Sequence, residues 1–286
     1  MKKITVIGAT GMIGIPVTKE LIKAGFEVTA LVRDENKAKK NFPQGVTFVK
    51  GDIEDKNSIV NSLKNAEGVY INISTKPTDK ENKFNPETQG IDNILWAIKQ
   101  SQIKQVAYLA SFLALNYTGN WWVMKAKKES IAKTKNCGVP YSIFYPSNFM
   151  ENFANGMKRG NKITTIGKSE NKSWWISGED FGKQVANLFK LDKSVNSEYS
   201  VQGLEGMTMS EAAQKFADSY TKEKLSVSSM PLGIFKFIGI FVPQVKFLAN
   251  LMEVMLNNVE TFEAQKTWNE LGKPTITLKE FASKQQ

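Results

Sequence analysis

Short apolar runs alternate with helical patterns through the first half of the chain. Each run is four or five residues long and rich in β-branched residues, as buried strands are. The runs are Ile4–Ile7, Val28–Val32, Val46–Val49, Val69–Ile73, Val106–Ala110 and Tyr141–Tyr145. Strands that alternate with helices predict parallel pairing through right-handed crossovers, and hence an α/β fold with a doubly wound parallel sheet.

Helical patterns fill the gaps between these strands. The first follows a glycine-rich turn and ends near Ala24, where Gly25 stops it, and Pro16 falls close to its start. Asp34 is a natural N-cap for the second helix. The other predicted helices are Glu35–Lys40, Ser58–Lys64, Thr88–Ser101 and Trp122–Asn136.

The alternation loosens after Ser147. A helix at Glu179–Leu191 and a strand at Tyr199–Val201 are expected to return to the sheet of residues 1–150, so that 179–201 belongs to it. Residues 151–178 and 203–286 are then left as a smaller C-terminal region that covers the substrate.

The most membrane-like stretch is residues 230–256. Lys236, Pro243, Lys246 and Glu253 interrupt it well short of the ~20 apolar residues that a membrane span requires. Its apolar residues recur at helical spacing: Phe247, Leu248, Leu251, Met252 and Met255. The spacing predicts one half-buried helix packed on the core, with a lid over an apolar substrate and membrane-surface docking as alternatives, in that order.

Composition excludes several kinds of chemistry. The chain has no His, and therefore no Ser-His-Asp triad, His metal ligand or imidazole acid or base. Its one Cys, Cys137, allows no intrachain disulfide and no Cys-based zinc site, so no metal is expected. Glycines break the N-terminal apolar run and no cleavage site follows, so we predict no signal peptide and a cytoplasmic location.

The net charge of +10 favours anionic ligands. The lysines are spread along the chain without a block of five like charges, so a nucleic-acid partner is not expected. A cofactor rich in phosphate groups would also account for this positive charge.

The turn Gly8-Ala-Thr-Gly11-Met-Ile-Gly14 directly follows a strand and opens a helix. Glycine lets the backbone turn tightly and approach a pyrophosphate, and the helix N-terminus offers free N–H groups. This context predicts a nicotinamide dinucleotide site, against the alternative of a merely structural turn. The residues expected to bind there are Gly8, Thr10, Gly11, Met12, Ile13 and Gly14.

The end of the second strand carries both an Arg and an Asp. Arg33 would bind a 2′-phosphate and favour NADP(H), whereas Asp34 would bind a ribose 2′-hydroxyl and favour NAD(H). Because Arg33 is nearer the strand, Lys37 is close behind and Asp34 is a natural N-cap, we favour NADP(H) over NAD(H).

Two further loops complete the expected cofactor site. Asp52 follows the third strand beside Ile53, where it could accept from the adenine amino group, although a plain Gly-Asp turn is the alternative. Ser74, after the fourth strand, joins the same set.

Taken together, these residues resemble the NmrA-like branch of the atypical short-chain dehydrogenase/reductase family, a group of NAD(P)-binding Rossmann proteins. The resemblance covers nearly the whole chain. It rests on Gly8–Gly14, Arg33, Gly51-Asp52, Lys125 with Glu129, Gly138–Asn152, Trp175–Asp180 and Leu271–Pro274. Members of this branch are NADP(H)-dependent reductases of quinones or related carbonyl and alkene substrates, and others are nucleotide-binding regulators with no known turnover.

The chain departs from the family at one catalytic position. In ordinary relatives a Tyr precedes a Lys by four residues; the Lys binds the nicotinamide ribose and lowers the pKa of the Tyr, which exchanges the substrate proton. Lys125 matches that Lys, but Trp121 stands in place of the Tyr. Ser111 matches the substrate-orienting Ser or is a simple loop hydroxyl. Tyr117 could replace the Tyr only if its loop folds back.

The missing Tyr suits quinone reduction better than alcohol oxidation, because water can supply the protons. Trp121 and Phe149, with Trp122, could form an apolar wall for a flat ring, with core packing as the alternative. Asn148 follows the sixth strand near the expected carboxamide of the nicotinamide.

We therefore expect an NADP(H)-binding oxidoreductase for a small electron-poor substrate. A non-catalytic NADP(H) sensor with a regulatory protein partner and a nucleotide-sugar epimerase or dehydratase are the alternatives, and a homodimer is left open.

Overall fold

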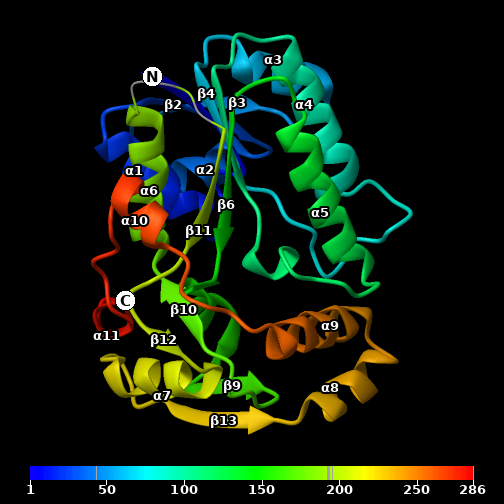
Figure 1. The fold of residues 1–286 in the computed structure, drawn as a ribbon, viewed down its shortest axis with the longest axis vertical. Helices are drawn as coiled ribbons and strands as arrows, with labels where there is room; N and C mark the ends of the chain where they lie inside the picture. The colour runs from blue at the N-terminus through cyan, green and yellow to red at the C-terminus, as the bar shows by residue number, and fades with distance from the viewer. Residues whose placement is uncertain (43, 192–193, 195, 286) are drawn as a thin grey trace.

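The computed structural model describes residues 1–42, 44–191, 194 and 196–285. Seven parallel strands form the central sheet in the order β11-β6-β5-β4-β1-β2-β3 (Figure 1). They are β1 (Lys3–Ile7), β2 (Glu27–Val32), β3 (Val46–Lys50), β4 (Gly68–Ile71), β5 (Gln105–Leu109), β6 (Tyr141–Pro146) and β11 (Ser197–Val201). The doubly wound parallel sheet is confirmed, and β11 pairs with β6 as expected for a return to the sheet.

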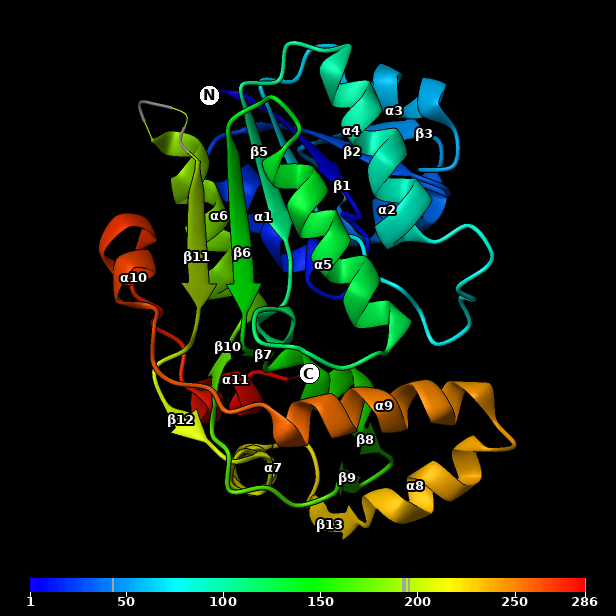
Figure 2. The same ribbon diagram turned by 45° about the vertical axis from the view of Figure 1, so that its right-hand side comes forward.

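Helices cover both faces of this sheet (Figure 2). One face holds α1 (Gly14–Lys23), α2 (Glu35–Asn41) and α6 (Gly178–Lys190); the other holds α3 (Lys56–Leu63), α4 (Ile91–Lys99) and α5 (Trp122–Lys135). Successive side chains of a strand point to opposite faces, so Tyr70 packs in one core while Val69 and Ile71 pack in the other.

A buried ion pair joins α5 to the π-helical turn Pro86–Gly90 that leads into α4. The Lys127 ammonium contacts the Glu87 carboxylate, and both side chains are almost fully enclosed. The Lys127 ammonium also lies 3.5 Å from the Tyr108 hydroxyl. Burial alone would lower the pKa of Lys127, but the charges and hydrogen bonds of Glu87 and Tyr108 together outweigh burial and raise the pKa above its usual value.

The smaller region lies at the carboxyl ends of the strands and has its own core, which includes Phe153, Trp175, Phe216 and Phe281. It contains two three-stranded sheets, β12-β10-β7 and β13-β9-β8. Their strands are β7 (Asn148–Phe149), β8 (Lys158–Arg159), β9 (Lys162–Ile166), β10 (Ser173–Ile176), β12 (Gly206–Met207) and β13 (Ser226–Met230). The later helices are α7 (Met209–Ser219), α8 (Leu232–Gly239), α9 (Pro243–Asn257), α10 (Gln265–Leu271) and α11 (Leu278–Ser283).

The chain passes more than once between this region and the central sheet. It leaves the central sheet after β6, forms β7 to β10, returns for α6 and β11, and leaves again at Gln202. α10 then packs on α6 and β11, and α11 packs on α7. The two parts of the molecule are thus interleaved along the sequence.

The half-buried helix predicted within residues 230–256 is confirmed for the part that forms α9, but the stretch as a whole is not one helix. Met230 ends β13, and α8 and α9 are separate helices that form a hairpin. Pro243 causes the break, because its ring cannot follow the preceding helix and suits the first position of a new one. The predicted apolar stripe from Phe247 to Met255 lies on α9 and is half-buried. None of the helices in the described ranges combines the length and apolar character needed to cross a bilayer.

Candidate active site

The strand order changes direction between β1 and β4. From β1 the chain proceeds outward to β2 and β3, and from β4 it proceeds outward on the other side, so a crevice forms at the carboxyl ends of β1 and β4. The glycine turn lies in this crevice beside Asn72. A side chain at Gly8 would overlap the Asn72 carbonyl oxygen, and one at Gly14 would overlap the carbonyl of Gly8. Gly8 also has a φ of 90°, which favours glycine.

The turn leaves backbone donors free at the start of α1. The Gly11 N–H donates to the Gly8 carbonyl at 3.1 Å, whereas in the described part of the chain those of Met12 and Ile13 donate to nothing. No side chain caps α1. Free N–H groups at a helix N-terminus are the partners that a diphosphate requires.

Arg33 and Asp34, the two charged residues after β2 between which the sequence did not decide, make different contacts in the structure. The Asp34 carboxylate caps α2, accepting from the Lys37 N–H at 3.0 Å. The Arg33 side chain is 71% exposed, and its Nε lies 3.8 Å from an Asp52 carboxylate oxygen. Arg33 is therefore largely exposed at this strand end, whereas Asp34 is engaged as a cap, and Lys37 is also exposed.

The loops after β3 and β4 are placed at the same edge. The other Asp52 carboxylate oxygen accepts from the Glu54 N–H at 3.1 Å, which is the turn role that the sequence offered as an alternative. The Ile53 carbonyl accepts from the Asn93 amide at 3.0 Å and so is tied to α4. Ser74 is exposed after β4.

The loop before α5 folds back on the helix start. The Tyr117 hydroxyl accepts from the Trp121 N–H at 2.8 Å, and the Lys128 ammonium donates to the Tyr117 carbonyl. Trp121 is the residue just before α5, and Lys125 is exposed one turn later. Ser111 is half-buried before a short 3₁₀ turn, Phe112–Ala114.

A cavity of about 720 Å³ opens beside this loop. Tyr117 and Trp121 form one wall, and Asn250 and Val254 of α9 form another. The Trp121 ring meets the Phe247 ring of α9 edge to face at 5.1 Å. The hairpin helix α9 therefore covers the predicted substrate wall. The cavity lining does not include Lys125 or Ser111.

Phe149 does not join that wall. Its side chain is 7% exposed and packs against Phe181 in the core, with 5.5 Å between ring centroids. The structure therefore supports the core-packing alternative for Phe149, while Trp121 borders the cavity. Phe247, which the sequence placed only on a helical stripe, is the aromatic residue that contacts Trp121.

The segment after β6 is fixed by a buried carboxylate. Glu260 accepts from the Ser147 hydroxyl at 2.8 Å and from the Gln202 amide at 2.7 Å. Burial raises the pKa of Glu260. The Asn148 side chain makes no hydrogen bond within the described ranges, so it keeps donors and an acceptor for a ligand.

A second carboxylate, Glu151, was not singled out from the sequence. One of its oxygens accepts from the Gly178 N–H at 2.7 Å at the start of α6, and the other is buried without a partner. Gly178 itself packs against Pro16 of α1. Burial raises the pKa of Glu151 to about 7. No local pattern distinguishes Glu151 from other acidic residues; its segment, Pro146–Asn152, was the only signal.

The chain is similar to known proteins in both sequence and fold. The family model described as NmrA-like matches residues 1–282. Among curated relatives, the chain is 23% identical to photosystem II assembly factor Ycf39 of Synechocystis sp. over 84% of this chain and 74% of that protein. It is 22% identical to quinone oxidoreductase 2 of Escherichia coli over 98% of this chain and 97% of that protein.

Solved structures of similar fold include two reductases. The NADPH-dependent quinone oxidoreductase of Escherichia coli has a TM-score of 0.74 at 21% identity, with 98% of each chain covered. Triphenylmethane reductase of Citrobacter sp., solved with NADP(H), has a TM-score of 0.75 at 18% identity, with 99% of each chain covered. These identities show a shared fold.

Proposed function

Since the chain belongs to the NmrA-like family, we propose that it is an NADPH-dependent oxidoreductase that reduces a small, flat, electron-poor substrate such as a quinone. The observation that carries the proposal is the combination of two features at one sheet edge. The glycine turn offers free N–H groups for a diphosphate, and a cavity walled by Trp121 and Tyr117 opens at the same end of the sheet. The names of two relatives, a quinone reductase and a triphenylmethane reductase, agree with a planar substrate.

Different residues on the cofactor side hold different parts of the dinucleotide. The turn from Gly8 to Gly14 holds the diphosphate, Arg33 holds the 2′-phosphate, and Lys125 holds the nicotinamide ribose. When bound, the reduced nicotinamide supplies a hydride.

On the substrate side, Trp121 offers a flat apolar face and no ionisable hydroxyl. Hydride transfer to a quinone leaves a hydroquinone anion, which can take the remaining proton from water. The chain therefore needs no side-chain acid at position 121, and oxidation of secondary alcohols, which needs a base at the hydroxyl, is expected to be negligible.

A non-catalytic sensor is the second candidate. It is favoured by the same Trp121 and by the relative named as an assembly factor. An epimerase or dehydratase is disfavoured, because that chemistry requires the Tyr that Trp121 replaces.

A single assay separates these functions. Purified protein is screened for NADPH oxidation with quinones, diazo dyes and enals as acceptors, and NADPH affinity is titrated in parallel. Turnover with quinones or dyes supports the reductase. Tight NADPH binding without turnover of any acceptor would contradict it and favour the sensor.

A further inference from the structure

The hairpin of α8 and α9 ends in an apolar tip that the rest of the chain leaves uncovered. The tip consists of Ile234, Phe237, Ile238, Ile240, Phe241 and Val242. Phe237 is 64% exposed, and Ile240 and Phe241 are each 72% exposed. Isolated exposed apolar residues are ordinary, but a contiguous group of this size marks an interaction surface.

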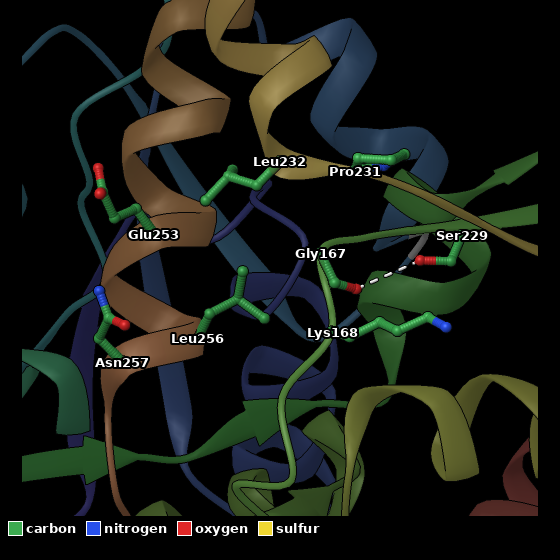
Figure 3. A pocket seen from close by; sticks show the side chains of 8 residues that line it. All are labelled: Gly167, Lys168, Ser229, Pro231, Leu232, Glu253, Leu256 and Asn257. Atoms are coloured by element: carbon green, nitrogen blue, oxygen red, sulfur yellow. Dashed lines mark hydrogen bonds between the residues drawn. The ribbon is translucent and has the colours of Figure 1, made fainter.

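The tip is a convex, supported end and not a loose loop. Figure 2 shows the two helices projecting together from one corner of the molecule. Gly239 packs on the Lys246 backbone, where an added side chain would lie 2.8 Å from the Lys246 Cα. On α8, Leu232 instead lies among the cavity-lining residues between the hairpin and Gly167 (Figure 3). The helix thus presents one apolar face inward and another to solvent.

The hairpin carries few charged groups near the tip. The sequence contains no acidic residue between Glu223 and Glu253. Lys236 lies on α8 and pairs with Glu253 at 2.6 Å. Lys246, on whose backbone Gly239 packs, is exposed and makes no ion pair in the described part of the chain. A free cationic group therefore borders an apolar tip whose own six residues carry no charge.

We propose that this tip docks on the surface of a bilayer that carries anionic lipids. The exposed Phe and Ile side chains would enter the boundary between headgroups and acyl chains, and the bordering Lys246 would contact the headgroups. A lid over the cavity does not account for the tip, because none of its six residues lines either cavity at the hairpin. This inference is independent of the proposed reaction.

Vesicle co-sedimentation tests the proposal with the full-length protein. Vesicles of phosphatidylglycerol with phosphatidylcholine are compared with vesicles of phosphatidylcholine alone. The wild type should partition onto the anionic vesicles, and added salt should weaken this binding. Phe237→Ser/Phe241→Ser should reduce the partition coefficient at least about tenfold, which corresponds to about 1.4 kcal/mol.

Two control variants test whether binding depends on the apolar tip and on the positive charge beside it. Trp96→Ser removes an exposed ring from α4, outside the hairpin, and should leave partitioning unchanged. Lys246→Gln should reduce binding to anionic vesicles only. Absence of wild-type binding, or equal binding by the Phe double variant, would overturn the proposal. A wild-type dimer that the Phe double variant converts to a monomer, with vesicle binding unchanged, would overturn it in favour of a second copy.

Discussion

Arg33 directly follows β2 with its guanidinium largely in solvent, while Asp34 is engaged as a helix cap. We expect charge-assisted hydrogen bonds from Arg33 to a 2′-phosphate to contribute about 1.5–3 kcal/mol. NADPH should therefore bind at least about tenfold more tightly than NADH, and Arg33→Ala should remove most of that difference. Calorimetric titration of both cofactors checks this, with the exposed Lys40→Ala as a control. Equal affinities in the wild type would contradict NADP(H) selection.

The Tyr117 hydroxyl oxygen accepts a hydrogen bond from the Trp121 N–H. The hydroxyl proton of Tyr117 therefore remains available beside the cavity. If water supplies the proton, Tyr117→Phe should change kcat for quinone reduction by less than about threefold, since kcat reports the lost transition-state interaction. Lys125→Ala should mainly weaken cofactor binding. Steady-state kinetics of the two variants are compared under conditions in which both variants are folded. A collapse of kcat in Tyr117→Phe alone would identify Tyr117 as the acid.

Glu151 makes the stability of the fold depend on pH. Its carboxyl has a pKa of about 7 in the folded chain, against 4.5 for an ordinary Glu, because burial disfavours the ionised form. Between these values the folded state binds the proton and the unfolded state does not. The contribution is thus fully present below pH 4.5 and is lost as pH rises through 7, by at most about 3 kcal/mol.

Glu151→Gln should abolish this dependence, because the amide keeps the shape without the titration. Urea unfolding at pH 5 and pH 8 checks it: relative to the variant, the wild type should lose stability at the higher pH. The exposed Glu54→Gln is the matched control. Parallel pH profiles of wild type and Glu151→Gln would show that the carboxyl is not desolvated.

At the scale of elements, the ion pair of Lys127 and Glu87 holds α5 on the turn before α4. Lys127→Met would leave a buried carboxylate without its partner, which should cost about 3–5 kcal/mol in the free energy of unfolding. Glu87→Gln in the same chain should recover most of that loss. Lys133→Met, which breaks an exposed pair with Asp92, should cost less than about 1 kcal/mol. Equal losses in denaturant unfolding would mean that Glu87 is solvated.

The inner strands of the central sheet were located closely from the sequence because they are apolar runs buried on both faces, whereas the edge strands β3 and β11 are only partly buried. The prediction for β4 extended to Ile73, whereas the strand ends at Ile71. The small sheets were not predicted. β8 and β12 have two residues each, and β9 and β13 carry Thr and Ser in place of a clear apolar pattern. Such strands are specified by neighbours distant in sequence.

The same limit applies to the candidate site. The glycine turn and the Asp34 cap follow from local spacing, and both are where the sequence places them. Asn72 borders the turn only because β4 lies beside β1, and Phe247 meets Trp121 only because α9 crosses the loop before α5. Contacts between elements that are distant in the sequence leave no local sequence pattern from which they could be predicted.

At the scale of the whole molecule, we expect the C-terminal region to control access to the sheet edge. Glu260 from the C-terminal segment accepts a hydrogen bond from Ser147 directly after β6, so this segment is bonded to the strand end. α9 places Phe247 and Val254 beside the loop that carries Trp121. The C-terminal segment thus supplies part of the wall of the cavity.

The chain passes repeatedly between the central sheet and the smaller region, and this has a consequence for the cooperativity of unfolding. β11 cannot pair with β6 until residues 148–176 have left the sheet and returned, and β11 also supplies Glu198, which binds Lys135 of α5 and the Tyr145 hydroxyl. Neither part is a continuous piece of chain that could melt alone. We expect one unfolding transition, with far-UV circular dichroism and tryptophan fluorescence coinciding along a urea titration. Two separated transitions would instead mean that each part holds its structure without the other.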